Sequence, residues 1–304
     1  MKDQLIGNSK ANQISLLGSL GPSVFLHAYN YARPNKSETN PLVKFYYLLV
    51  TSDVEAVFNS MSEYINDIND EAERMVLIAY FKGYLNMYSL ERNVQPFIYY
   101  FGGFRRSRKI MDTSAFVRMA LETSIDVLFE QTLRESTPLH KIINVSNIDV
   151  KIISKMFYNI AINVYSLSDI KQDSFCGACK KIKTRLAAIS SPFPSVRKLI
   201  NAIFPSKYVR SSIRTKKVER TDKYDYLNLR KNTWRHPTAG VEINADFLQL
   251  FNDAKEENQY VNMIVKKVAN RKSIKSDLKE FCMDINYFGF QYNTEPIFLD
   301  SVRE

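Results

Sequence analysis

The chain has 304 residues and a formal net charge of +10, and its 45% hydrophobic and 24% charged residues are the proportions of a globular protein, not of a disordered one. Three cysteines are too few for a disulfide framework, and neither a secretory signal nor an apolar run long enough to cross a bilayer stands out. We therefore expect an intracellular, cytoplasmic protein without a membrane span, large enough to form one domain or two lobes.

The first 40 residues predict an N-terminal arm or strand segment. Residues 23–31 are rich in strand-forming side chains and lie between Gly21-Pro22 and Pro34, which favours a short strand. This strand either pairs in a small sheet or belongs to an extended arm that reaches a neighbouring subunit.

Helical patterns dominate from residue 41 and predict a first helical lobe over residues 41–170. Pro41 suits the first turn of a helix, and Ser52 followed by Glu55 has the spacing of a capping box. The third helix is expected to end before Pro96. The helices predicted in this lobe span residues 41–50, 52–65, 70–90, 113–134 and 149–168.

A basic β-hairpin is predicted inside this lobe, over residues 97–110. Gly102-Gly103 separates two runs of strand-forming residues, and a glycine pair suits a two-residue turn. The hairpin either offers a contact for phosphate groups or is a surface turn whose cations bind nothing specific. The basic residues beside the turn are Arg105, Arg106, Arg108 and Lys109.

The rest of the chain predicts a second, basic helical lobe over residues 171–286 and an aromatic C-terminal arm over 287–304. The arm either folds onto its own domain or docks on the next subunit. The predicted fold is therefore mainly α, with two helical lobes, a small β-hairpin and extended N- and C-terminal arms. Helices are expected at 179–189, 194–204, 245–254, 256–268 and 276–287, and residues 205–226 are expected to order on binding.

Positive charge is concentrated in residues 180–235. This stretch holds 16 Lys and Arg residues against 3 Asp and Glu, a net charge of +13, so the rest of the chain sums to −3. Aromatic side chains are interleaved with the cations. Because cations neutralise phosphates and aromatic rings stack on bases, this mixture favours a single-stranded nucleic acid as partner. The alternatives are a solvated charged surface, an anionic membrane and an acidic protein.

The candidate RNA-binding residues come from this stretch and from the predicted hairpin. We expect them to converge on one surface of the folded chain. They are Arg105, Arg106, Arg108, Lys109, Arg185, Lys198, Lys207, Tyr208, Arg210, Arg214, Lys216, Lys217, Arg220 and Trp234.

The two neighbouring cysteines do not predict a metal site. Cys176 and Cys179 have the spacing of a zinc knuckle, but a second Cys-x-x-Cys pair is missing and the nearest histidine, His236, is distant in the sequence. We expect structural thiols, with metal binding and redox chemistry as the lesser alternatives. No cofactor is expected.

Catalysis is not predicted either. Arg134 with His140, and Arg230 with His236, share the loose spacing seen in one superfamily of helical ribonucleases, but prolines interrupt or follow both pairs. Paired acids, such as those at 71 and 73 and at 256 and 257, indicate solvated helix faces.

Three short fragments resemble motifs of the nucleoproteins of segmented negative-strand RNA viruses, in particular of the emaravirus group. They are residues 163–166 (Asn-Val-Tyr-Ser), 184–187 (Thr-Arg-Leu-Ala) and 289–292 (Gly-Phe-Gln-Tyr). Thr184 stands where the family has Asn, and Gln291 stands where it has Glu. The resemblance implies a protein that coats genomic RNA without sequence preference, with RNA in a basic cleft between lobes and arms exchanged between protomers. Arg185 is the RNA-facing residue that it implies.

We therefore expect a viral nucleoprotein that binds single-stranded RNA and self-associates, located in the cytoplasm and in the virion. A filamentous coat protein, a helical ribonuclease or antiviral effector, and an adaptor for an acidic partner are the rival hypotheses.

Overall fold

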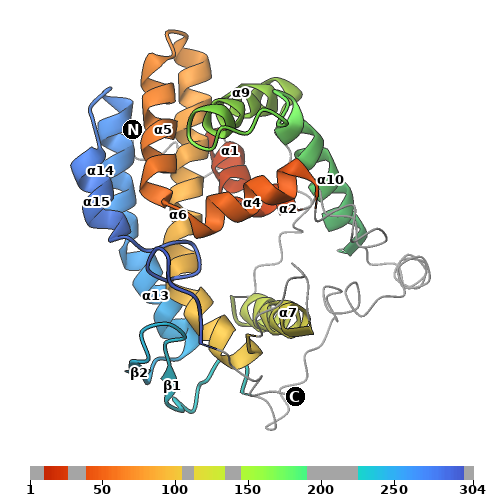
Figure 1. The fold of residues 1–304 in the computed structure, drawn as a ribbon, viewed down its shortest axis with the longest axis vertical. Coiled ribbons are helices and arrows are strands. Elements are labelled where there is room, and N and C mark those ends of the chain that lie inside the picture. Colours follow the sequence, from red (N-terminus) through yellow and green to blue (C-terminus); the bar gives the residue numbers. More distant parts are fainter. Residues whose placement is uncertain (1–9, 27–38, 105–112, 134–144, 190–224, 298–304) are drawn as a thin grey trace.

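The structure, a computed structural model, consists mainly of α-helices arranged around one long helix, α6 (Figure 1). It describes residues 10–26, 39–104, 113–133, 145–189 and 225–297. The predicted mainly α fold is confirmed. The elements are α1 (Lys10–Gly18), α2 (Ser23–Leu26), α4 (Pro41–Thr51), α5 (Val54–Asp67), α6 (Glu71–Gly102), α7 (Thr113–Leu133), α9 (Asn147–Asn163), α10 (Ser174–Ile189), β1 (Trp234–Arg235), β2 (Glu242–Ile243), α13 (Phe247–Glu256), α14 (Asn258–Ala269) and α15 (Lys275–Cys282).

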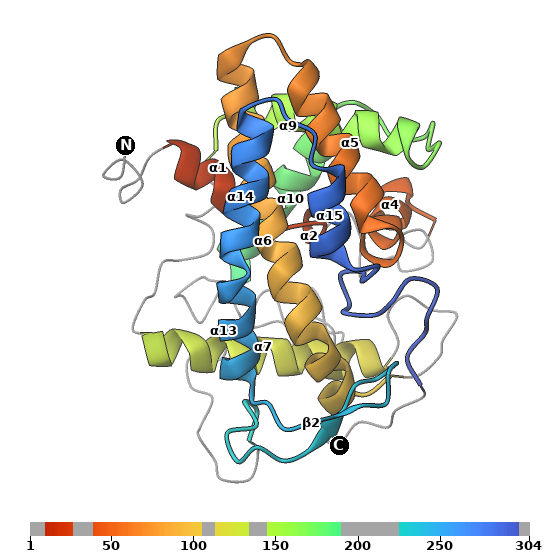
Figure 2. The ribbon, with the colours of Figure 1, turned by 90° about the vertical axis from the view of Figure 1, so that its left-hand side faces the viewer.

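Helix α6 is 32 residues long and is covered on most sides. Its first turn is capped by Asp70, whose carboxylate accepts hydrogen bonds from the backbone N–H groups of Ala72 and Glu73. Helices α1, α7, α9, α13 and α14 all pack against it. Figure 2 shows α13 and α14 in front of α6, with α7 crossing its lower half. The apolar residues on nearly every face of α6 are the reason it lies at the centre.

The predicted hairpin at 97–110 is wrong over the residues that the structure describes, because α6 continues through Gly102. Val94, Phe97, Ile98 and Phe101 are all buried, and their spacing is that of one helix face. Gly103, with φ of +79°, ends the helix instead of forming a two-residue turn. The remainder of the predicted hairpin, 105–110, lies outside the described residues.

Pro96 does not end α6, and the C-terminal segment packs against the helix at this residue. A proline has no N–H, so the carbonyl of Arg92, one turn earlier, loses its helical partner. Gly289 lies against this carbonyl and the proline ring, with φ of +73°. A Cβ atom there would lie 2.6 Å from Cγ of Pro96 and would overlap the Arg92 carbonyl. The close approach therefore requires glycine.

Two hydrophobic clusters lie along α6. The first surrounds its N-terminal two thirds and includes buried side chains of α1, α2, α4, α5, α9, α10, α14 and α15. The second surrounds its C-terminal end and is formed with α7, α13 and the β1–β2 hairpin. The predicted lobe boundary near residue 170 falls inside the first cluster, which contains Ile170 and residues on both sides of it.

The strand predicted at 23–31 is wrong over its described part, because residues 23–26 form the single turn α2. Phe25 is buried there, and its ring meets the rings of Phe45 and Phe157 at centroid distances of 4.9 and 5.0 Å. In this fold Phe25 therefore contributes to aromatic packing in the first cluster and not to a strand.

The capping residue of α5 also differs from the prediction. Asp53, not Ser52, accepts a hydrogen bond from the N–H of Ala56, while the Ser52 hydroxyl donates to the carbonyl of Leu48. The helices predicted at 41–50, 113–134, 149–168, 179–189, 245–254, 256–268 and 276–287 are found as α4, α7, α9, α10, α13, α14 and α15, with shifted ends.

The short hairpin β1–β2 is antiparallel and pairs Trp234 with Ile243. The helix predicted at 276–287 ends at Cys282, and the segment after it folds onto its own chain up to residue 297. Tyr287 and Phe290 are buried in it, and Ile285 forms an isolated bridge with Gln291. None of the described helices is both long enough and apolar enough to cross a membrane.

Candidate nucleic-acid interface

Most of the predicted RNA-binding residues lie outside the described part of the chain, so their role stays a prediction. Arg185 lies on α10, with its side chain outside that part, and Trp234 lies on β1. The helix predicted at 194–204 is outside as well. The residues that fall there are Arg105, Arg106, Arg108, Lys109, Lys198, Lys207, Tyr208, Arg210, Arg214, Lys216, Lys217 and Arg220.

The prediction that Trp234 stacks on RNA bases is wrong for this fold. The side chain is 1% exposed, and its indole N–H donates to the carbonyl of Ala245 at 2.9 Å. Its ring packs edge-on against the Phe97 ring in the second cluster, with 5.7 Å between the ring centroids. Trp234 was assigned to RNA because basic residues surround it in the sequence, but in the fold it is a core residue.

Helix α10 carries the exposed cations that the structure describes in the first part of the basic stretch. Phe175, Ala178, Cys179 and Ile182 are buried in the first cluster, at the spacing of one helix face. The opposite face exposes three lysines, which we call the α10 lysine face. It consists of Lys180, Lys181 and Lys183.

Helix α9 packs against α10 and is fixed at its N-terminus by a buried carboxylate. The Ser146 hydroxyl accepts a hydrogen bond from the N–H of Asp149 and caps the helix. The Asp149 carboxylate is 3% exposed and pairs with Lys10 of α1 at 2.8 Å. The Ser154 hydroxyl donates to the carbonyl of Gln172, which ties α9 to the turn before α10. Helix α9 is therefore held at its N-terminal end by Lys10 and at its middle by the turn before α10.

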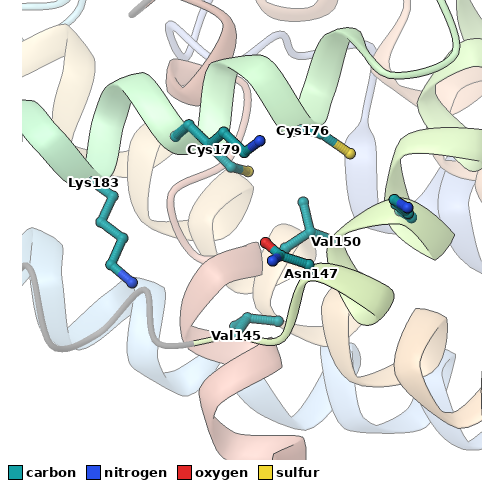
Figure 3. A pocket seen from close by; sticks show the side chains of 8 residues that line it. Val145, Asn147, Val150, Cys176, Cys179 and Lys183 are labelled. Atoms are coloured by element: carbon teal, nitrogen blue, oxygen red, sulfur yellow. The ribbon is translucent and has the colours of Figure 1, made fainter.

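A pocket of about 290 Å³ lies between α9 and α10 (Figure 3). Three of its lining side chains are lysines, and none is a carboxylate. In Figure 3, Val145, Asn147 and Val150 lie on the α9 side, and Cys176, Cys179 and Lys183 come from α10 on the other. We call it the lysine pocket. Its lining residues are Val145, Asn147, Val150, Lys151, Cys176, Cys179, Lys180 and Lys183.

The thiols in this pocket differ in exposure. Cys176 is half-buried, whereas Cys179 is buried, and burial together with the nearby Cys176 raises the pKa of the Cys179 thiol. Cys282 is buried elsewhere, and burial raises its pKa to about 12. Among the described residues, no group of three or more His, Cys, Asp and Glu side chains is placed to hold a metal ion.

The described cations of the 180–235 stretch do not converge on one surface. Lys231 pairs with Asp246 at 4.0 Å, and Arg235 pairs with Glu242 at 3.0 Å. These residues lie at the β1–β2 hairpin, at the lower end of α6, whereas α10 lies beside its upper half (Figure 1). Over the described residues, the predicted single basic surface is therefore reduced to α10 and its neighbour α9.

His236 is not placed as an acid-base catalyst, which weakens the ribonuclease hypothesis. Its Nδ1 accepts a hydrogen bond from the N–H of Ala239 at 3.2 Å, so Nε2 carries the proton and donates to the carbonyl of Gly289 at 3.1 Å. Burial lowers the pKa of the imidazole. The other ribonuclease-like pair, Arg134 and His140, lies outside the described residues.

Glu257, which the sequence predicted to lie on a solvated helix face, belongs to a partly buried network. Glu257 pairs with Arg92 at 2.8 Å and accepts a hydrogen bond from Asn93. A second acidic pair escaped the sequence interpretation because its members come from α6 and α7. Gln95 donates to both Glu91 and Glu122, and burial, followed by the neighbouring Glu122, raises the pKa of Glu91 to about 8.

The three motif fragments lie at the end of α9, on α10 and in the C-terminal segment. Comparison of the chain with family models, with curated proteins and with solved structures gave no match.

Proposed function

We propose that the chain binds single-stranded RNA through its phosphates, without sequence preference, and self-associates, in the manner of the viral nucleoproteins whose motifs it resembles. The observation that carries the proposal is the separation of charge along the sequence. Residues 180–235 hold 16 basic and 3 acidic residues, while the rest of the chain is net negative. Such segregation favours a polyphosphate partner.

The first ten residues of this stretch, which lie on α10, support the proposal. Helix α10 buries its apolar face in the first cluster and exposes Lys180, Lys181 and Lys183. Lys151 and Lys155 are exposed on the neighbouring helix α9. The three lysines of the α10 face make no ion pair with another described residue, so they are available to phosphate oxygens. Because a backbone binder needs cations without a fixed base-reading geometry, lysines on a helix face are sufficient.

The test is fluorescence-polarisation binding of unrelated single-stranded RNAs over a salt series. The variant Lys180→Glu/Lys181→Glu/Lys183→Glu should bind more weakly to every sequence. Since each phosphate contact on a single strand contributes about −0.7 to the slope of log K against log salt, the slope should become shallower by about 2.

The matched control reverses three exposed lysines elsewhere, with the same change in net charge. Lys255, Lys266 and Lys272 are exposed and make no ion pair with another described residue. Helices α13 and α14, which carry the first two, lie on the other side of α6 from α10 (Figure 1). The control triple should keep most of the affinity and the slope. Equal losses in the two triples would reject the α10 lysine face as the binding surface.

Electron microscopy and a gel of the same samples separate the rival functions. Rings or filaments that form with RNA support a nucleoprotein. Filaments formed equally well without RNA support a structural coat protein. Shortened RNA supports a nuclease.

A further inference from the structure

We propose that the lysine pocket between α9 and α10 binds one nucleoside phosphate unit, with the phosphate on the lysines and the base against the apolar wall. The inference rests on the proposed function for the source of the ligand, an RNA strand, but a free nucleotide has the same chemistry. It goes beyond backbone binding because it assigns a pocket to a single nucleotide.

The charge of the pocket selects an anion. Lys151 comes from α9, and Lys180 and Lys183 come from adjacent turns of α10, so cations approach the space from two helices. No carboxylate lines the pocket. Asp149, the acid closest to it along α9, is turned to Lys10 and Ser146. No described carboxylate therefore neutralises the pocket lysines. A bound phosphate group would supply the missing negative charge.

The rest of the lining suits a flat, weakly polar ring. Val145, Val150 and the Cys179 side chain offer apolar surface, and Asn147 offers an amide that both donates and accepts hydrogen bonds. Figure 3 shows the Asn147 amide in the space between the two helices. Apolar walls with one polar group that fixes orientation are the usual composition of a small-molecule site.

The volume limits the size of the ligand. At about 290 Å³ the pocket lies just below the roughly 300–1,000 Å³ of small-molecule sites. This volume limits the ligand to a single small unit and excludes a stacked run of bases. An RNA strand that uses the pocket would therefore place a single nucleotide in it and continue along the α10 lysine face.

Cys176 provides a direct reading of occupancy. It is half-buried on the pocket wall, whereas the other cysteines of the chain, Cys179 and Cys282, are buried. A maleimide should therefore modify Cys176 first, and mass spectrometry of the peptides locates the label. The experiment measures the rate of this modification in the full chain with adenosine 5′-monophosphate, adenosine, inorganic phosphate or a single-stranded RNA oligonucleotide.

Adenosine 5′-monophosphate at about ten times its Kd should slow the labelling of Cys176 about tenfold, because a filled pocket excludes the reagent. Adenosine or phosphate alone should protect much less at the same concentration. The variant Lys180→Glu/Lys183→Glu, and independently Lys151→Glu on the other helix, should remove the protection. The control Lys255→Glu/Lys266→Glu should retain it.

The RNA arm separates this proposal from the proposed function. Protection by both the mononucleotide and RNA supports a pocket that binds one nucleotide of an RNA strand. Protection by the mononucleotide alone supports a pocket for free nucleotides. RNA binding without protection by the mononucleotide overturns the pocket and leaves the backbone interface standing. Protection that survives both lysine variants also overturns the pocket.

Discussion

Arg92 joins three helices from inside the molecule. Its guanidinium pairs with Glu257, at the junction of α13 and α14, and donates to the carbonyl of Phe281 on α15. It also lies over the rings of Tyr88 and Phe281, at 5.2 and 4.7 Å from their centroids. A buried guanidinium depends on its partners, because loss of either Arg92 or Glu257 leaves the opposite charge unpaired.

We predict that Arg92→Met lowers the free energy of unfolding by about 3 kcal/mol, since it leaves the partly buried Glu257 carboxylate and the Phe281 carbonyl without their donor. Denaturation in urea, followed by circular dichroism, measures the change. Glu256→Ala, at the exposed neighbour of Glu257, should stay within about 0.5 kcal/mol. A loss of similar size in both variants would contradict the role of the Arg92 network.

The pair of Glu91 and Glu122 predicts a pH-dependent stability. The pKa of Glu91 is raised in the fold, so the folded chain holds a proton that the unfolded chain releases. Stability should therefore be greatest below about pH 4.5 for this group, should fall as the pH rises toward about 8, and should level off above it.

Glu91→Gln should remove this dependence, because the amide cannot ionise. Its melting temperature should exceed that of the unmodified chain at pH 8 and should match it near pH 5. The exposed Glu280→Gln, a variant with the same change of charge, should follow the unmodified chain at both values. Equal curves for all three proteins would show that the α6–α7 carboxyl pair does not titrate in this range.

At the scale of the elements, the packing of α1 on α6 depends on two glycines. A Cβ atom on Gly83 would overlap the Ser15 carbonyl of α1, and one on Gly18 would overlap the Tyr80 carbonyl of α6. The two backbones therefore touch where the helices cross. This contact holds α1 in place, and with it Lys10, the partner of Asp149 at the start of α9.

Gly83→Ala should lower the free energy of unfolding by about 1–3 kcal/mol, because the methyl group separates the two helices. Gly177→Ala is the matched control, since a Cβ there meets nothing within 4 Å. On α10 the same change should stabilise the chain by about 0.5–1 kcal/mol. The two unfolding curves should therefore move in opposite directions.

The sequence allowed most helices to be predicted, because amphipathic segments such as α5 and α14 show one apolar face. It failed at the end of α6, because residues 97–101 are all aromatic or aliphatic and this run resembled a strand. Pro96 also suggested that the helix ends, and Gly102 with Gly103 suggested a two-residue turn. The segment that packs against Pro96 contains Gly289, which is remote in the sequence.

The site was predicted only in part. The lysines of α10 follow from charge alone, but the lysine pocket needs α9 beside α10, a contact that no local pattern contains. Trp234 was assigned to RNA because charge surrounds it in the sequence, whereas its environment in the fold is the second cluster. Composition near a residue and its surroundings in space are different quantities.

For the whole molecule, the central feature is that both hydrophobic clusters contain α6. The first includes Leu77 and Tyr84, and the second includes Phe97 and Phe101 of the same helix. Because one continuous helix contributes side chains to both clusters, we expect loss of one cluster to destabilise the other.

The single tryptophan tests this coupling. Trp234 reports on the second cluster, so its fluorescence transition in urea should coincide with the far-ultraviolet circular dichroism transition. Ile153→Val, a change of about 0.5–1.5 kcal/mol in the first cluster, should shift both midpoints equally. A tryptophan transition that stays in place would show two independently folding units.

The contact of Gly289 with Pro96 also orders events during synthesis. Residues 71–102 leave the ribosome early, yet the partner that covers the Arg92 carbonyl is translated almost two hundred residues later. Until then the face of α6 that carries Pro96 and the Arg92 carbonyl lacks the segment that packs against it in the folded protein. The packing at the end of α6 is therefore completed only when almost all of the described chain has been translated.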